Sequence, residues 1–192
     1  RYSAGFGAGW DVWTAKYCLI GLTSYHAATG DSAALEAARR LADLLIRRFQ
    51  PGSPSILRTD THGGMASGSV LIGVTRLYEL TSDPAYLDFA HHLMSELDSV
   101  QGPRLRPTLL SEGLVSKVGN GKAYEMLSCI HGMLELGRIT GTDDMIAAAV
   151  TAWDDLRSHH LYLTGTASFG EHFHRPGALP GSASATMGET CV

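Results

Sequence analysis

The sequence has little cysteine, little charge and no long hydrophobic run, and each shortage excludes a class of protein. Its three cysteines, Cys18, Cys129 and Cys191, are too few and too scattered along 192 residues for a disulfide framework, and they do not indicate a redox compartment. Lys and Arg number 15 against 19 Asp and Glu, which leaves a net charge of -4 and no basic run that could neutralise phosphates. We therefore expect no nucleic-acid partner.

The apolar stretches and the start of the sequence exclude two further features. Charge or glycine interrupts every apolar stretch before it reaches the roughly 20 residues that a membrane-spanning helix needs. The first residues, RYSAGFGAGW, have neither the charged start nor the apolar stretch of a signal peptide, and they lack an initiator Met. We expect no membrane span and a natural amino terminus further upstream. Neither the compartment nor the oligomeric state can be predicted.

A helical hairpin is repeated three times along the chain, whose 44% hydrophobic content is enough for a substantial core. Gly21, Gly73 and Gly132 each precede, by eight residues, a Thr that opens a short polar turn. Apolar residues then follow each glycine at the same three distances: Leu35, Leu87 and Ile146; Ala38, Ala90 and Ala149; Leu45, Leu97 and Leu156. The helical spacing of these residues predicts helix, turn and helix in each copy.

The turn residues suit such hairpins. Gly30 and Gly141 can adopt the left-handed conformation that ends a helix, whereas Asp31 and Asp83 can cap the helix that follows. Pro84 stands where a first helical turn tolerates proline. One hairpin alone cannot bury its apolar face, so the copies must stack.

Long loops follow each hairpin, at about residues 50–64, 100–121 and 161–190, and loops of this length are usually functional. The sequence therefore predicts an all-α fold, an α/α barrel (toroid) built from helical hairpins, with a long irregular or short β-hairpin loop near the C-terminus. Six hairpins would close such a ring. Residues 1–192 are expected to form about half of one domain, with the rest missing at the C-terminus and at the N-terminus.

The last loop combines side chains that bind metals or transfer protons. These are Glu171, His172, His174, Glu189 and Cys191, within 21 residues that are otherwise rich in Gly, Pro, Ser and Thr. Their spacing alone favours an ordinary solvated loop. Spacing alone therefore does not predict a catalytic or metal site.

Two stretches of this loop resemble a known family. YLTGTASFGEHF and ATMGETCV resemble the active-site loop of glycoside hydrolase family 127, the β-L-arabinofuranosidase group. The likeness covers nearly the whole chain, through WDVWTAKYCLIGLTSYHAATGD, THGGM, LYELTSDPAYLDFA and KAYEMLSCIHGMLELGRITG. It implies an α/α barrel, in agreement with the repeat.

The resemblance also implies a chemistry. Zinc is bound by a Glu and by the Cys two residues later, matched here by Glu189 and Cys191, and by two adjacent cysteines further along the chain. One of those cysteines is the nucleophile of a retaining reaction, and a Glu matched by Glu171 acts as general acid and then base. Zinc would deprotonate the thiol, and packing of Glu171 against Phe169 or Phe173 would raise the pKa of its carboxyl group. Residues 1–192 alone are expected to be inactive.

Three further residues are expected to contact the sugar substrate: His62, Lys122 and Tyr124. His62 could equally be a structural or capping residue, and family members often carry His near the position of Lys122. Lys16 matches a family position too, but a lysine on a helix is usually solvated. Cys18 and Cys129 stand among apolar helical neighbours and are predicted to be core residues.

The predicted function is a retaining glycosidase that releases L-arabinofuranose or a related sugar from glycans. Two alternatives remain. One is a non-catalytic carbohydrate-binding protein of the same fold, in which the loop is purely structural. The other is a sugar epimerase on a similar barrel, which would use histidines in place of a metal thiolate, because one fold supports many chemistries.

Overall fold

The computed structural model describes residues 10–59 and 62–178, and it confirms the all-α fold. No strand forms in these ranges, and no helix there is long and apolar enough to cross a membrane. The helices are α1 (Asp11–Thr29), α2 (Ser32–Phe49), η1 (Ile56–Thr59), α3 (Met65–Gly68), α4 (Leu71–Thr81), α5 (Pro84–Asp98), α6 (Leu105–Glu112), η2 (Val115–Lys117), α7 (Ala123–Thr140) and α8 (Asp143–His159).

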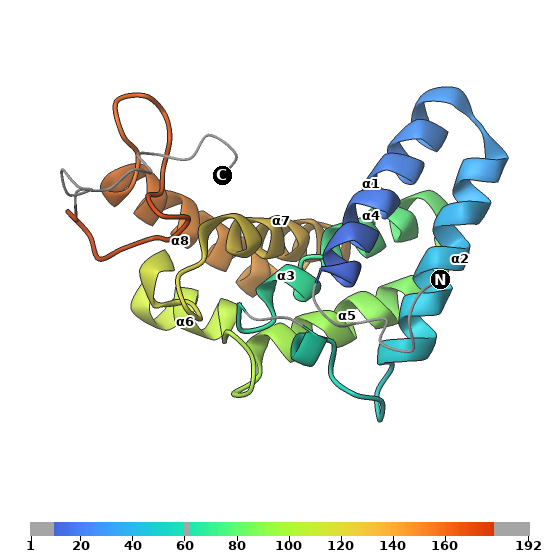
Figure 1. The fold of residues 1–192 in the computed structure, drawn as a ribbon, viewed down its shortest axis with the longest axis horizontal. Helices are drawn as coiled ribbons and strands as arrows, with labels where there is room; N and C mark the ends of the chain where they lie inside the picture. The colour runs from blue at the N-terminus through green and yellow to red at the C-terminus, as the bar shows by residue number, and fades with distance from the viewer. Residues whose placement is uncertain (1–9, 60–61, 179–192) are drawn as a thin grey trace.

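The three predicted hairpins are α1–α2, α4–α5 and α7–α8. Figure 1 shows them following one another from α2 at one end of the molecule to α8 at the other. The first helices of the hairpins pack side by side in the order α1, α4, α7, and we call them the first-helix row. Each second helix packs on its own first helix, and α6 lies against both α5 and α8.

The turn residues act as predicted. Gly30 and Gly141 end α1 and α7 in the left-handed conformation, with φ of 74° and 67°. The side chains of Asp31 and Asp83 accept hydrogen bonds from the amides of the second residue after each, which caps α2 and α5. Local chemistry therefore determines where each hairpin turns.

The repeated glycines lie where the helices of the first-helix row come closest. A Cβ atom added to Gly73 of α4 would lie 2.8 Å from Cβ of Leu19 on α1, and one added to Gly132 of α7 would lie 2.9 Å from the backbone nitrogen of Ile72 on α4. Around Gly21 of α1, no described atom lies within 4 Å of such a Cβ. The glycines of α4 and α7 thus allow neighbouring helices to approach more closely than any other residue would permit.

The segment 100–121 differs from the predicted loop because it contains α6. The residue before this helix, Arg104, has a left-handed backbone and provides no side-chain cap. Instead, Asp98 at the end of α5 accepts hydrogen bonds from the backbone N–H of Arg106 at 3.0 Å and from its Nε at 2.9 Å. A tertiary contact therefore replaces the local capping signal, and sequence patterns do not detect it.

The two described cysteines behave differently. Cys129 is fully buried in α7, as predicted, and its thiol donates to the carbonyl oxygen of Met65 at 3.1 Å. Cys18 is exposed, so its prediction as a core residue is wrong. It lies on α1 next to the exposed Tyr17, on a side of the helix that no described element covers.

The glycine contact can be tested by adding a single methyl group to the full-length protein. Gly132→Ala should lower the free energy of unfolding by about 1 kcal/mol, because overpacking typically costs about 1–3 kcal/mol and exceeds the helix-propensity gain of up to about 1 kcal/mol. Gly21→Ala is the matched control and should stabilise by a similar propensity gain. Urea unfolding measures both. Equal stabilisation by the two substitutions would contradict the proposed close contact.

Candidate active site

The C-terminal loop docks on the start of α7 through its backbone. The N–H of Phe173 donates to the carbonyl oxygen of Gly121 at 2.8 Å, and the N–H of Ala123 donates to that of Glu171 at 2.9 Å. Gly121 has a φ of 77°, and a Cβ there would lie 2.9 Å from the carbonyl oxygen of Phe173. Among the described residues, the predicted β-hairpin loop is limited to two isolated bridges, Phe169 with His172 inside the loop and Lys122 with His172 across the junction. The second bridge joins two loops whose residues Lys122 and Glu171 are 49 positions apart.

An ion pair forms at this junction between Lys122 and Glu171. The ammonium group hydrogen-bonds the carboxylate, and this bond and its charge lower the pKa of Glu171 below the usual range. Lys122 is buried with 6% of its surface exposed, whereas the Glu171 side chain is 59% exposed. Glu171 is therefore a carboxylate that faces solvent and is neutralised from beneath.

The predicted apolar environment of Glu171 is wrong. Phe169 stacks on His174, with ring centroids 3.8 Å apart, and Phe173 is buried against the ring of His160. The hydrogen bond and the charge of Lys122 outweigh the small desolvation of the carboxylate, so the pKa of Glu171 is lowered rather than raised. The sequence could not show this, because the charge that dominates comes from Lys122, on a different loop.

Glu171 also has an unusual backbone conformation. Its φ of 58° lies in the left-handed region, directly after Gly170 with the same φ. A residue other than glycine rarely adopts this conformation, and it persists only where the surroundings enforce it, often at functional sites. The two backbone hydrogen bonds of the docked loop provide that constraint, and they aim Glu171 at the junction.

A second carboxylate, Glu125, lies buried beneath the ion pair. It is 3% exposed, and its Oε1 lies 3.9 Å from Nζ of Lys122 and 4.0 Å from Nε2 of His62. No described group hydrogen-bonds its Oε2. Sequence analysis assigned this residue no role, although a charged residue on the buried side of a helix was a usable signal. Glu125 thus places a negative charge between two predicted sugar contacts.

Aromatic residues gather beside these charges and surround Lys16. Its Nζ lies 3.3 Å from the ring centroid of Trp13, 4.3 Å from that of Tyr17 and 5.3 Å from that of Tyr124, and it donates to Oγ of Ser128 at 3.3 Å. Lys16 is only 2% exposed, so its prediction as a solvated charge is wrong. Burial lowers the pKa of its ammonium group to about 8. The aromatic faces stabilise the buried cation in place of water.

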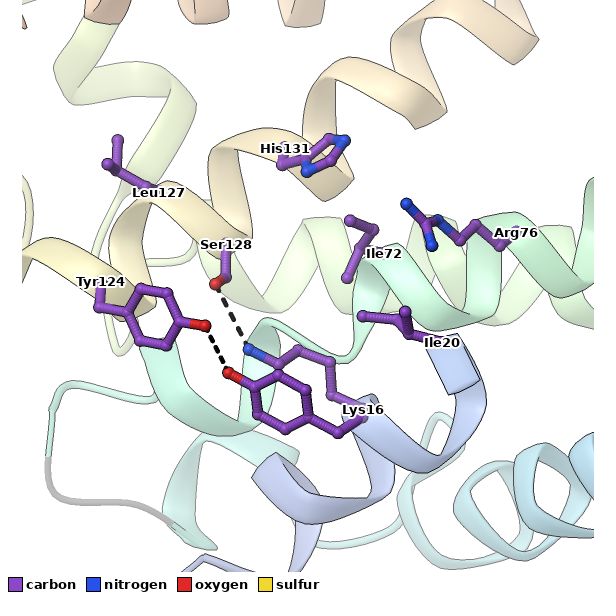
Figure 2. A pocket seen from close by; sticks show the side chains of 9 residues that line it. Lys16, Ile20, Ile72, Arg76, Tyr124, Leu127, Ser128 and His131 are labelled. Carbon is purple, nitrogen blue, oxygen red and sulfur yellow. Dashed lines mark hydrogen bonds between the residues drawn. The ribbon is translucent and has the colours of Figure 1, made fainter. Parts of the chain in front are cut away.

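A pocket of about 320 Å³ opens between α1, α4 and α7, on the first-helix row. Figure 2 shows the side chains that line it. They are Lys16, Tyr17, Ile20, Ile72, Arg76, Tyr124, Leu127, Ser128 and His131. Tyr124 connects this pocket to the junction, because it stands two residues after Lys122 at the start of α7.

The structure therefore brings four of the predicted site residues to one region. Lys122 contacts Glu171, Glu125 connects Lys122 to His62, and Tyr124 follows on the same helix. The predicted zinc ligands Glu189 and Cys191 lie outside the described residues. Within residues 10–59 and 62–178, no three His, Cys, Asp or Glu side chains are grouped so that they could bind a metal. The described part can thus supply an acid or base and sugar contacts, and it leaves the metal site as a prediction.

The chain is similar to known proteins in sequence and in fold. A non-reducing end β-L-arabinofuranosidase of Bifidobacterium longum subsp. longum is 25% identical over 193 residues, which cover 88% of this chain and 28% of that protein. A solved structure described as a glycoside hydrolase shares the fold with a TM-score of 0.72 and 18% identity, over 95% of this chain and 32% of that one. The chain thus spans about a third or less of the length of these proteins.

The family comparison covers almost every residue. The model for the catalytic domain of the β-L-arabinofuranosidases of glycoside hydrolase family 127 matches residues 3–192. The helical hairpins and the docked loop with its ion pair lie within this match. The chain belongs to glycoside hydrolase family 127.

Proposed function

We propose that the protein is a retaining glycosidase that releases L-arabinofuranose or a related sugar from the ends of glycans. Family membership and the activity named for the Bifidobacterium relative support the reaction class. The observation that carries the proposal is Glu171, a solvent-facing carboxylate on a constrained left-handed turn, held by the buried Lys122. A proton-transfer group needs this combination of access and fixed position.

Glu171 acts twice in the proposed reaction. A retaining glycosidase first needs an acid that protonates the leaving-group oxygen and then the same group as a base that activates water. The pKa of Glu171 is lowered by Lys122, so the free enzyme holds the form required for the second step. For the first step, the sugar must draw Lys122 away, because removal of the positive charge allows the carboxylate to hold a proton.

Lys122, His62 and Tyr124 bind and orient the sugar in this proposal. Lys122 and His62 both lie within 4.0 Å of the buried Glu125, which fixes where their nitrogen atoms point. The Tyr124 hydroxyl bonds that of Tyr17 at 2.6 Å, so its ring is fixed between the junction and the pocket. Fixed donors lower the entropy cost of positioning a substrate.

Zinc, held in part by Glu189 and Cys191, completes the proposal. Bound zinc would keep a cysteine nucleophile from a later part of the chain in its thiolate form. Thiolate, carboxylate and imidazole are the ligand types that zinc prefers, and the spacing of Glu189 and Cys191 matches the family motif. Both residues belong to the segment that follows the docked loop in the sequence.

The role of Glu171 is tested by the isosteric change Glu171→Gln in the full-length protein. Loss of proton transfer should lower kcat for an aryl β-L-arabinofuranoside by about 10²–10⁴-fold, since general acid–base catalysis typically contributes that much. Glu36→Gln, on the exposed surface of α2, is the matched control and should keep full activity. Unchanged hydrolysis by the Glu171 variant would remove Glu171 from catalysis. Sugar binding without hydrolysis, by the natural protein and the variant alike, would favour a carbohydrate-binding protein whose loop is structural.

The charge of Lys122 makes a separate prediction about pH. Because Lys122 lowers the pKa of Glu171, Lys122→Met should raise that pKa. The basic limb of the kcat/KM profile, which reports the acid in the free enzyme, should then move to higher pH. A loss of activity with an unshifted profile would show that Lys122 only binds the sugar.

Metal analysis tests the zinc ligands. Full-length protein should carry zinc, and Cys191→Ser or Glu189→Gln should lose most of it and most of the activity. Cys18→Ser is the control for the loss of a thiol, because Cys18 is exposed on α1 and far along the chain from the motif. Zinc content that is the same in all three variants would remove Glu189 and Cys191 from the site.

A further inference from the structure

Basic side chains gather in the pocket of the first-helix row, although the chain as a whole is negatively charged. Lys16, Arg76 and His131 line the pocket, and none of the nine residues that line it is Asp or Glu. The net charge of the chain is -4, so this is not a property of the composition. The three side chains come from three helices, which the packing of the row brings together.

Lys16 contributes a cation that lacks a counter-charge of its own. In the part of the chain that the structure describes, it forms no ion pair, and its one hydrogen bond is to Ser128. The thiol of Cys129 and the carboxylate of Glu125 favour its charged form, but burial outweighs both, and Glu125 also lies beside Lys122 and His62. A buried ammonium group held by aromatic faces and one hydroxyl, without an ion pair, is further stabilised when an anion binds beside it. The lowered pKa of Lys16, caused by desolvation, agrees with this view.

Arg76 and His131 lie across the pocket from Tyr124, as Figure 2 shows. Arg76 forms no ion pair within the described ranges. The Nε2 of His131 lies 3.9 Å from Glu135, but that carboxylate is already bound by Arg138 at 2.9 Å. A guanidinium group presents two parallel N–H donors, and this geometry matches a carboxylate.

The rest of the lining suits a sugar ring. Tyr17 and Tyr124 provide aromatic surface beside Lys16, and Ile20, Ile72 and Leu127 provide an apolar floor. The volume of about 320 Å³ lies at the lower end of the range for small-molecule sites, about 300–1,000 Å³, which suits a single sugar residue. Apolar walls with a few fixed polar groups are the usual composition of such sites.

We propose that this pocket binds an acidic sugar, a uronic acid residue of the glycan, with its carboxylate held by Arg76 and Lys16 and its ring packed on Tyr124. This inference rests on the proposed function in one respect: it assumes that the ligand is part of a glycan. It makes the preferred substrate an acidic glycan and not a neutral one. Because Tyr124 lies two residues from Lys122, the uronic acid would be a near neighbour of the sugar that Glu171 acts on.

The test compares two probes that differ only at C6, which is a carboxylate in one and a hydroxymethyl group in the other. Dissociation constants of methyl D-galactosiduronic acid and of methyl D-galactoside are measured by ligand-observed NMR on the full-length protein at neutral pH. The acidic probe should bind at least about tenfold more tightly, because one charge-assisted contact is worth a factor of that size. Arg76→Gln and Lys16→Met should each bring the two constants close together, whereas Arg40→Gln, on the exposed side of α2, should leave the preference intact.

Three results would overturn this inference. They are equal affinity for the two probes, no binding of either, and binding of inorganic sulfate as tight as that of the acidic probe, which would indicate a site for free anions. Glu171→Gln separates this proposal from the preceding one. If that variant still prefers the acidic probe, the pocket is supported whether or not the protein is a glycosidase. If the protein hydrolyses the substrate but shows no preference for the acidic probe, only the pocket proposal is wrong.

Discussion

The close approach of α1, α4 and α7 is the constraint on which the rest of the structure depends. It is possible because glycine stands at the contact points, Gly73 against Leu19 and Gly132 against Ile72. At these positions a side chain would push two helices apart, and such contacts in a dense core leave little room for adjustment. Lys16 lies on α1 and Tyr124 on α7, the outer two helices of the row. The distance between them therefore depends on both glycine contacts, one between α1 and α4 and one between α4 and α7. The pocket and its aromatic wall are therefore consequences of helix packing.

The chemistry is added by the loop that docks on the start of α7. Two backbone hydrogen bonds hold the loop there, and they place Glu171 next to Lys122. This placement depends on the backbone and not on the neighbouring side chains. Electrostatics then determines the form of the carboxylate, because a buried cation next to an exposed acid favours the ionised state. Glu125 extends the same arrangement inward and fixes Lys122 and His62 from beneath. Rigid helices thus position the binding groups, and the loop positions the reactive one.

Local signals in the sequence were sufficient for the hairpins and not for the environment of the site. The helical spacing, Gly30, Asp31 and Asp83 act through neighbours in the chain, so the pattern alone predicts their structure. The pattern did not predict three contacts that depend on the folded geometry: Asp98 caps α6, Lys122 lowers the pKa of Glu171, and aromatic residues surround Lys16. The family motif selected Glu171, His62, Lys122 and Tyr124, and the structure brings these together. The charge states of these residues depend on contacts in the folded protein, which the spacing of residues in the sequence does not predict.

The account makes Glu171 the group that exchanges a proton with the glycosidic oxygen, with Lys122 displaced by the sugar. A crystal structure of the full-length protein with L-arabinofuranose bound tests this most directly. The account predicts a Glu171 oxygen within hydrogen-bonding distance of the anomeric oxygen, about 2.6–3.2 Å, and Nζ of Lys122 moved from the carboxylate onto a sugar hydroxyl. A sugar bound elsewhere on the first-helix row, with the Lys122–Glu171 ion pair intact, would contradict it.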